Sequence, residues 1–191
     1  MMTQPPDSIH WRRNAPATIS FIQRHWLFRP GALTAGLRRL GAVRLQVVRE
    51  YAWGASPEDA VLLHRPPGTP VWVREVAMDI DGTPAVVARS LVPLQASHSW
   101  WRGMRGLGSR PLADLLYHNP QISRSDFLVS RLQKQQNLHA TVRYAAAPLP
   151  AARAHQLLAR CSVFWRMGQP LVVAECFLPE FWDIAGKHPP W

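Results

Sequence analysis

The sequence predicts an α+β fold, a single domain in which helices flank an antiparallel β-sheet. Two segments, residues 71–92 and 162–178, each have the pattern of two strands joined by a tight turn. Segments with apolar side chains at helical spacing precede the first of them and lie between the two. The length of 191 residues suits one domain, and a hydrophobic content of 47% is enough to fill its core.

The N-terminal third predicts a tail followed by two helices. Residues 1–17 are polar and contain prolines, which indicates a poorly ordered tail. Residues 19–28 (ISFIQRHWLF) have the pattern of a short amphipathic helix that ends at Arg29-Pro30. In residues 33–40 (LTAGLRRL) the leucines recur at helical spacing, and Gly41 is a natural C-terminal cap.

A strand and a loop are expected next. Residues 43–51 (VRLQVVREY) begin with alternating apolar and polar side chains, which is the pattern of a strand. Residues 54–70 contain four prolines and two glycines, so we expect them to form a loop.

Residues 71–92 (VWVREVAMDIDGTPAVVARSLV) form the clearest element, a β-hairpin. Asp81-Gly82 between two apolar runs favours a type I′ turn, because both central residues of that turn need a positive φ. With a two-residue loop, Ile80 faces Thr83, and continuing this register places Arg74 directly opposite Arg89.

Two arginines on one otherwise apolar sheet face need an explanation, because like charges at opposed positions destabilise a sheet. One interpretation is a pocket for an anionic ligand, with more than one carboxylate. The alternative is that each arginine pairs with an internal acid or extends to the edge of the sheet. The first is favoured by the scarcity of carboxylates, 12 Asp and Glu against 22 Lys and Arg.

Residues 108–112 (GSRPL) look like the entrance to a helix, with Ser109 as its cap and Pro111 in the first turn. The backbone N–H of Leu112 then belongs to the unpaired donors of that turn, which suit an anion. Water or Ser109 can equally take these donors.

The C-terminal third predicts a second hairpin. Residues 130–150 lack a period and are expected to form a loop or insertion, and residues 151–160 a helix. Residues 162–167 and 171–178 form two strands around Gly168-Gln169, and residues 180–191 a tail. Glu175 is a lone carboxylate on an apolar strand face, which suits acid–base work, although a simple ion pair with Arg74 or Arg89 explains it as well.

Composition excludes several classes of function. The net charge of +10 comes from scattered arginines, without a polybasic block or a nucleic-acid-binding motif, so we expect no nucleic-acid partner. Cys161 and Cys176 form no CxxC motif, the histidines show no metal-binding spacing, and no phosphate-loop, dinucleotide or GxSxG motif occurs. Neither a signal peptide nor a membrane-spanning run is present, which predicts a soluble cytoplasmic protein.

Three blocks, WVREVAMDIDGTPAVVARSLVP, LGSRPLADLLY and GQPLVVAECFLP, occur in the order and nearly the spacing of the chorismate lyase family. The upstream run ALTAGLRRLGAVRLQVVREY is also similar, so the resemblance covers about residues 31–179. It implies a monomeric enzyme with an enclosed ligand pocket and no cofactor or metal, which converts chorismate to 4-hydroxybenzoate and pyruvate at the start of ubiquinone synthesis. The domain is then residues 18–179.

The resemblance also implies roles for single residues. Arg74 binds the ring carboxylate, assisted by the backbone N–H groups of Leu112 and of Leu33, where the family has a methionine. Glu175 binds the ring hydroxyl, and Arg89 holds the enolpyruvyl carboxylate or orients Glu175. The chain departs from the family in a longer stretch at about residues 125–158.

Two other functions remain open at this point. The same fold serves as the effector-binding domain of some bacterial transcription regulators, so a non-catalytic binder of aromatic acids is the main alternative to the lyase. A basic protein associated with nucleic acid is the other, and salt-dependent DNA binding would identify it.

Overall fold

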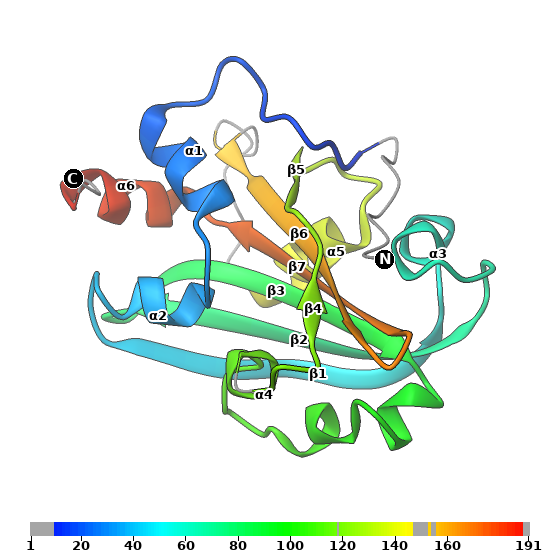
Figure 1. The fold of residues 1–191 in the computed structure, drawn as a ribbon. Coiled ribbons are helices and arrows are strands. Elements are labelled where there is room, and N and C mark those ends of the chain that lie inside the picture. Colours follow the sequence, from blue (N-terminus) through cyan, green and yellow to red (C-terminus); the bar gives the residue numbers. More distant parts are fainter. Residues whose placement is uncertain (1–9, 118, 147–152, 154–155, 189–191) are drawn as a thin grey trace.

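A seven-stranded antiparallel sheet organises the chain (Figure 1). The computed structural model describes residues 10–117, 119–146, 153 and 156–188. The strands follow one another in the order β1-β2-β3-β7-β6-β4, and β5 also pairs with β6. Their bounds are β1 Val43–Gly54, β2 Pro70–Ile80, β3 Thr83–Pro93, β4 Ser123–Arg124, β5 Leu128–Arg131, β6 Leu158–Arg166 and β7 Gln169–Phe177. The predicted α+β class with an antiparallel sheet is confirmed.

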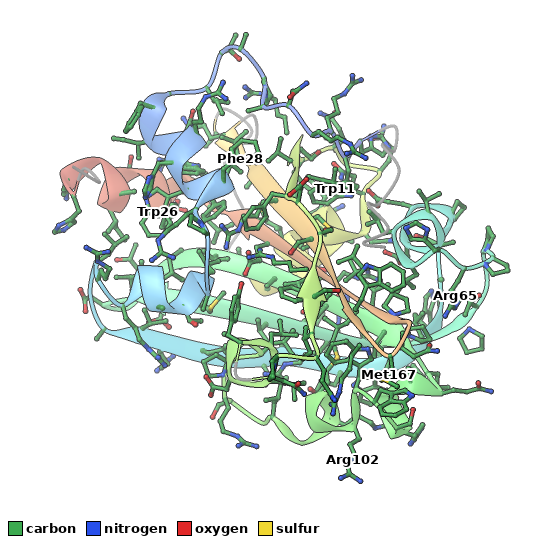
Figure 2. All side chains as sticks on the ribbon, in the orientation of Figure 1. Trp11, Trp26, Phe28, Arg65, Arg102 and Met167 are labelled. Carbon is green, nitrogen blue, oxygen red and sulfur yellow. The ribbon has the colours of Figure 1, made fainter. Side chains whose placement is uncertain are left out.

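Helices lie on both faces of this sheet. On one face α1, α2 and α6 share a buried apolar cluster with the sheet, which includes Trp26 of α1 (labelled in Figure 2). The ring centroids of Trp26 and Phe181 of α6 are 5.0 Å apart. On the other face α3, α5 and Trp11 pack in a second cluster. The helices are α1 Phe21–Phe28, α2 Leu33–Leu37, α3 Pro57–Leu63, α4 Ala113–Leu116, α5 Asn137–Ala145 and α6 Pro179–Lys187, with 3₁₀ turns at Ala96–His98 and Arg102–Gly106.

The first hairpin, β2–β3, has the predicted turn but not the predicted register. Asp81 and Gly82 adopt φ values of 50° and 80°, and Ile80 pairs with Thr83. Between Met78 and Asp79, however, the register shifts, which leaves Ala85 as an extra residue on β3. Such a bulge moves every later side chain to the other face of the sheet.

Because of the bulge, Arg74 pairs with Ser90, and Arg89 pairs with Glu75. The prediction that Arg74 and Arg89 face each other was therefore wrong, and the two guanidinium groups lie on opposite faces of the sheet. The alternative, an ion pair with internal acids, holds for Arg89, which is hydrogen-bonded to both oxygens of Asp59 at 2.8 and 3.0 Å.

The second hairpin and the two early helices are present as predicted, but their ends differ. Helix α2 ends at Leu37 with Arg38 as its C-cap, so Gly41 does not cap it, and the turn of the second hairpin lies one residue before the predicted Gly168-Gln169. Met167 and Gly168 form the turn between β6 and β7 with φ values of 50° and 71°. Helix α1 begins at a capping box in which Ser20 and Gln23 exchange side-chain-to-backbone hydrogen bonds. Both cysteines are free and buried, and burial raises the pKa of each thiol.

Five further local predictions were wrong. The expected loop at residues 54–70 contains α3, and the expected loop at residues 130–150 contains α5. Residues 158–160 belong to strand β6 rather than to a helix, and the expected C-terminal tail forms α6. Helix α4 begins after Leu112 without a side-chain cap, so Ser109 does not cap it.

Part of the predicted N-terminal tail, residues 1–17, packs against the rest of the domain. Residues 1–9 lie outside the described residues, but Trp11 is only 2% exposed and Arg12 pairs with Val129 of β5. Within the predicted insertion, residues 147–152 and 154–155 lie outside the described residues as well.

Candidate active site

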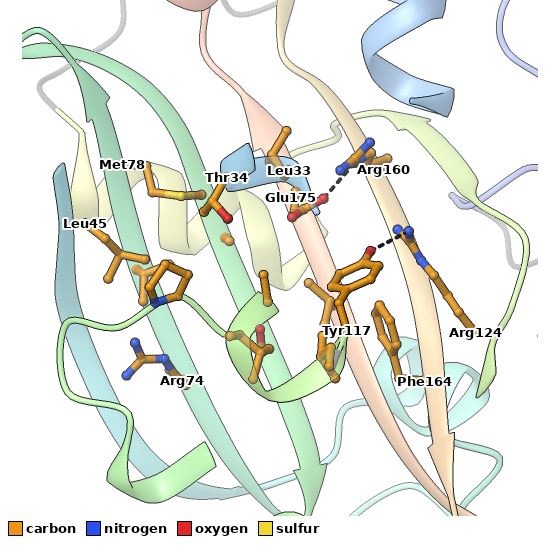
Figure 3. Close-up of a pocket in the computed structure, with 18 residues that line it drawn as sticks. Leu33, Thr34, Leu45, Arg74, Met78, Tyr117, Arg124, Arg160, Phe164 and Glu175 are labelled. Atoms are coloured by element: carbon orange, nitrogen blue, oxygen red, sulfur yellow. Dashed lines mark hydrogen bonds and ion pairs between the residues drawn. The ribbon is translucent and has the colours of Figure 1, made fainter. Parts of the chain in front are cut away.

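A cavity lies between one face of the sheet and the segments that carry α2 and α4 (Figure 3). Together with the open solvent at its mouth, it contains about 590 Å³ of space free of atoms. The wall is mostly apolar. It is formed by Leu33, Thr34, Leu45, Arg74, Val76, Met78, Ala88, Ser90, Pro111, Leu112, Ala113, Leu116, Tyr117, Arg124, Arg160, Phe164, Val173 and Glu175.

The sheet places the polar groups of this cavity in two neighbouring rows. One row runs across four strands through Val76, Ala88, Glu175 and Arg160. The next runs through Arg74, Ser90, Val173 and Ser162. Paired residues of adjacent strands point to the same side, so Arg74 and Glu175 project from one face at separate places.

Arg74 is a fixed cation at one side of the cavity. Its side chain is 2% exposed, and its Nη1 donates to Glu50 Oε1 at 2.6 Å. Its Nη2 donates to the backbone carbonyls of Gly108 and Arg110 at 2.8 and 3.3 Å. The loop before α4 therefore holds the guanidinium in one orientation, and Leu112, the N-cap residue of α4, lines the same cavity.

Glu175 and Arg160 form the other charged group. Arg160 Nε donates to Glu175 Oε2 at 2.6 Å, and Arg160 Nη1 donates to the carbonyls of Trp26 and Arg29 at 3.0 and 3.1 Å. These carbonyls lie at the C-terminal end of α1, where a cation is favourable. Arg160 thus holds α1 against the sheet and orients the carboxylate at the same time.

Tyr117 and Arg124 complete the polar lining on the side of Glu175 away from Arg74 (Figure 3). Arg124 Nη1 donates to the Tyr117 hydroxyl at 2.8 Å, and that hydroxyl donates to the carbonyl of Gly31 at 2.9 Å. Burial raises the pKa of Tyr117, which the neighbouring guanidinium of Arg124 partly offsets, and burial lowers the pKa of Arg124.

The cavity brings together four of the five predicted site residues, Leu33, Arg74, Leu112 and Glu175. Arg89 does not line it, because it lies on the opposite face with Asp59, and its Nε is 3.6 Å from Glu75. A site role for Arg89 through direct contact with a ligand in this cavity has no geometric support.

Sequence reasoning missed three ionisable residues of the lining, Tyr117, Arg124 and Arg160. For Arg160 the predicted turn gave the wrong register, because a loop at Gly168-Gln169 places residue 162 opposite Glu175, whereas the observed turn at Met167 and Gly168 places Arg160 there. For Arg124 no periodic signal exists, since β4 has only two residues.

The lining indicates a ligand with several polar groups around an apolar body. Three guanidinium groups and one carboxylate lie among the apolar side chains of the wall. Because the cations are in excess, the cavity favours a ligand with anionic groups. Among the described residues no group of three or more His, Cys, Asp or Glu side chains is arranged to hold a metal ion. In the same part of the chain, no helix has the length and apolar character needed to cross a membrane.

The chain has close relatives with a common description. Residues 6–187 match the family model for chorismate lyase. A protein of Bordetella pertussis named "Probable chorismate pyruvate-lyase" is 54% identical over 97% of this chain and 96% of its own length. A protein of Burkholderia pseudomallei named "Probable chorismate pyruvate-lyase 1" is 43% identical over 91% of each chain.

Solved structures show the same fold at low identity. The C-terminal domain of the histidine utilization repressor from Pseudomonas syringae is 17% identical, with a TM-score of 0.50 over 72% of this chain and 92% of that one. At this identity the similarity concerns the fold alone. The match of the family model across nearly the whole chain, together with the relatives, shows that the chain belongs to the chorismate lyase family.

Proposed function

We propose that this chain is a chorismate lyase that eliminates pyruvate from chorismate and leaves 4-hydroxybenzoate, the first step of ubiquinone synthesis. The reaction proposed uses no cofactor and takes place in a monomeric cytoplasmic enzyme. The observation that carries the proposal is that Arg74 and Glu175 project into one cavity from neighbouring rows of the sheet, in a chain of this family.

The cavity suits the ring of chorismate, which carries a carboxylate on one carbon and a hydroxyl on the opposite carbon. Arg74 binds the ring carboxylate, because it is the fixed cation on the side of α4. The backbone N–H groups of Leu112 and Leu33 assist it. Among the described residues, none accepts a hydrogen bond from Leu112 N–H, so this donor is available to a ligand.

Glu175 binds the ring hydroxyl at the other end. Its Oε2 accepts from Arg160, whereas its Oε1 accepts no hydrogen bond from the described residues. A ring held at both ends is positioned for elimination without large rearrangements, and positioning alone lowers a barrier substantially.

The elimination breaks the bond between a ring carbon and the ether oxygen of the enolpyruvyl group. The electron pair of that bond moves to the oxygen, and the carbon that bears the hydroxyl loses its proton as the ring becomes aromatic. The proton goes either to Glu175 or to the leaving group, and the released enol becomes pyruvate. Fixed guanidinium groups in the cavity stabilise the charge that grows on the leaving group.

The decisive experiment is a turnover assay with purified protein and chorismate, in the presence of EDTA. The proposal predicts equal amounts of 4-hydroxybenzoate, measured by chromatography, and of pyruvate, measured with lactate dehydrogenase. Tight binding of 4-hydroxybenzoate without any pyruvate release would instead identify an aromatic-acid-binding protein of the same fold.

A further inference from the structure

The three arginines that line the cavity differ in whether a carboxylate of the protein neutralises them. Arg74 is paired with Glu50 and Arg160 with Glu175, each at 2.6 Å. Among the residues that the structure describes, Arg124 has no such partner. Its Nε donates to Ser162 Oγ at 3.0 Å and its Nη1 to the Tyr117 hydroxyl, and its guanidinium carbon lies 3.9 Å from the ring centroid of Phe127.

All of these contacts of Arg124 are with uncharged groups. Among the described residues, no carboxylate lies within ion-pair distance of its guanidinium. A partly buried cation without a counter-charge is costly, and a bound anion removes that cost. The cavity therefore presents one cation that is available to an anionic group of a ligand.

The position of Arg124 indicates which anionic group this is. Arg124 extends from β4, whose neighbour β6 carries Arg160, and it lies with Tyr117 on the Glu175 side of the cavity (Figure 3). In the proposed binding mode, the ring carboxylate is at Arg74 and the hydroxyl at Glu175. The enolpyruvyl ether is attached to the ring carbon next to the one that bears the hydroxyl, so this substituent leaves the ring near Glu175.

We propose that Arg124 binds the carboxylate of the enolpyruvyl group and stabilises the enolpyruvate as it leaves, a role that rests on the proposed lyase function. The resemblance to the family implied that Arg89 makes this contact or orients Glu175, but Arg89 is on the other face of the sheet with Asp59. Tyr117 is a positioning residue, because its hydroxyl accepts from Arg124 and is itself held by Gly31.

The step balances without a further reactant. As the ring C–O bond breaks, its electron pair moves to the ether oxygen of the leaving enolpyruvate. The guanidinium of Arg124 stays protonated throughout and neutralises the leaving group's carboxylate, which favours the transition state where charge grows. The proton lost from the ring ends on the enolpyruvate, which then becomes pyruvate.

A purely structural role is the competing explanation, since Arg124 also links Tyr117 to Ser162 across β4 and β6. The two roles predict different results, because 4-hydroxybenzoate lacks the enolpyruvyl carboxylate. A residue that contacts this group affects chorismate and leaves 4-hydroxybenzoate binding nearly unchanged. A residue that only supports the cavity affects both ligands alike.

The experiment compares Arg124→Gln and Arg124→Lys with the control Arg44→Gln. The side chain of Arg44 is 79% exposed, so this control removes one positive charge from the surface instead of from the cavity. For each variant, kcat/KM for chorismate and the Kd for 4-hydroxybenzoate are measured. We expect Arg124→Gln to lower kcat/KM by about tenfold to a hundredfold, which is the loss typical of a hydrogen bond to a charged group. The Kd should change by less than about threefold, and Arg124→Lys should be intermediate.

Equal losses in kcat/KM and in 4-hydroxybenzoate affinity, or no loss in either, would overturn the assignment of Arg124. If Arg124→Gln does not fold, the same comparison is made with Arg124→Lys, which keeps the charge but not the planar geometry. Failure of the wild-type protein to release pyruvate is a separate result, because it overturns the proposed function itself.

Discussion

Arg160 and Glu175 are paired residues of the adjacent strands β6 and β7, and the guanidinium of Arg160 donates to one carboxylate oxygen of Glu175 at 2.6 Å. The same guanidinium bonds two carbonyls at the end of α1. The orientation of Glu175 therefore depends on the docking of a helix that lies about 150 residues away in sequence. The second carboxylate oxygen remains open toward the cavity.

Replacing Glu175 tests whether this open oxygen binds the ring hydroxyl. Glu175→Gln keeps the size of the side chain but removes the negative charge that Arg160 bonds. We expect kcat/KM for chorismate to fall by at least about tenfold, the scale of one lost polar contact in a transition state. Steady-state assays measure this, with Glu180→Gln as the matched control, because Glu180 of α6 is partly exposed and does not line the cavity. Normal turnover in Glu175→Gln would exclude the contact.

Replacing Arg74 should affect substrate and product alike, because both carry the ring carboxylate. For Arg74→Ala we expect kcat/KM for chorismate and the affinity for 4-hydroxybenzoate each to fall by at least about tenfold. Isothermal titration and steady-state kinetics measure the two quantities. A variant that loses only chorismate turnover, with unchanged 4-hydroxybenzoate affinity, would contradict the placement of the ring carboxylate at Arg74.

Arg89 should matter for folding rather than for ligand contact. Its removal leaves Asp59 and Glu75, which are 3% and 1% exposed, without a shared cation. We expect Arg89→Met to lower the free energy of unfolding by about 3–5 kcal/mol, the usual cost of breaking a buried ion pair. Urea unfolding measures this.

The folded fraction of Arg89→Met should keep kcat/KM within about threefold of the wild-type value, since Arg89 does not line the cavity. Asp59→Asn, which weakens the same pair from the other side, serves as the comparison. If Arg89→Met is stably folded but its turnover is reduced more than tenfold, Arg89 has a role in the active site after all.

Tyr117 should control how fast product leaves. Its side chain is 42% exposed, and with Arg124 it lines both the cavity and a surface hollow bordered by Phe28, Gly31 and Phe127. Tyr117→Phe keeps the ring but loses the hydrogen bonds to Gly31 and Arg124. We expect 4-hydroxybenzoate to dissociate several-fold faster, because a lost hydrogen bond contributes about 1 kcal/mol, which corresponds to a change of that size in the rate.

Stopped-flow displacement of bound 4-hydroxybenzoate measures this dissociation rate, and Tyr144→Phe is the matched control because Tyr144 is 66% exposed and lies outside the cavity lining. An unchanged dissociation rate in Tyr117→Phe would show that the hydroxyl does not restrict the exit.

The sequence predicted the parts of the site that depend on local patterns. The turn of the first hairpin follows from Asp81 and Gly82, which adopt positive φ, whereas the turn of the second hairpin lies one residue before the predicted position. Glu175 is conspicuous because it interrupts an apolar strand face. Arg74 was found for the same reason. The helix-entrance pattern at residues 108–112 gave the N–H of Leu112. The resemblance to a family then added Leu33, whose proposed contribution is through the backbone and leaves little pattern in the side chains.

The features of the fold and the site that could not be predicted from the sequence depend on one extra residue in β3 and on packing between segments far apart in the chain. The bulge at Ala85 has no strong local signal, yet it moves Arg89 from the cavity to the other face. The helices α3 and α5 lie in stretches with prolines or without apolar period, where tertiary packing outweighs local propensity. Arg124 reaches the cavity only because a two-residue strand pairs with β6.

The central claim is that a ring is held between Arg74 and Glu175 inside this cavity, and a crystal structure of the protein with 4-hydroxybenzoate tests it most directly. The account predicts the ligand carboxylate at Arg74 and the backbone N–H of Leu112, and the ligand hydroxyl at the free oxygen of Glu175. A ligand bound in the reverse orientation, or outside the cavity altogether, would contradict it.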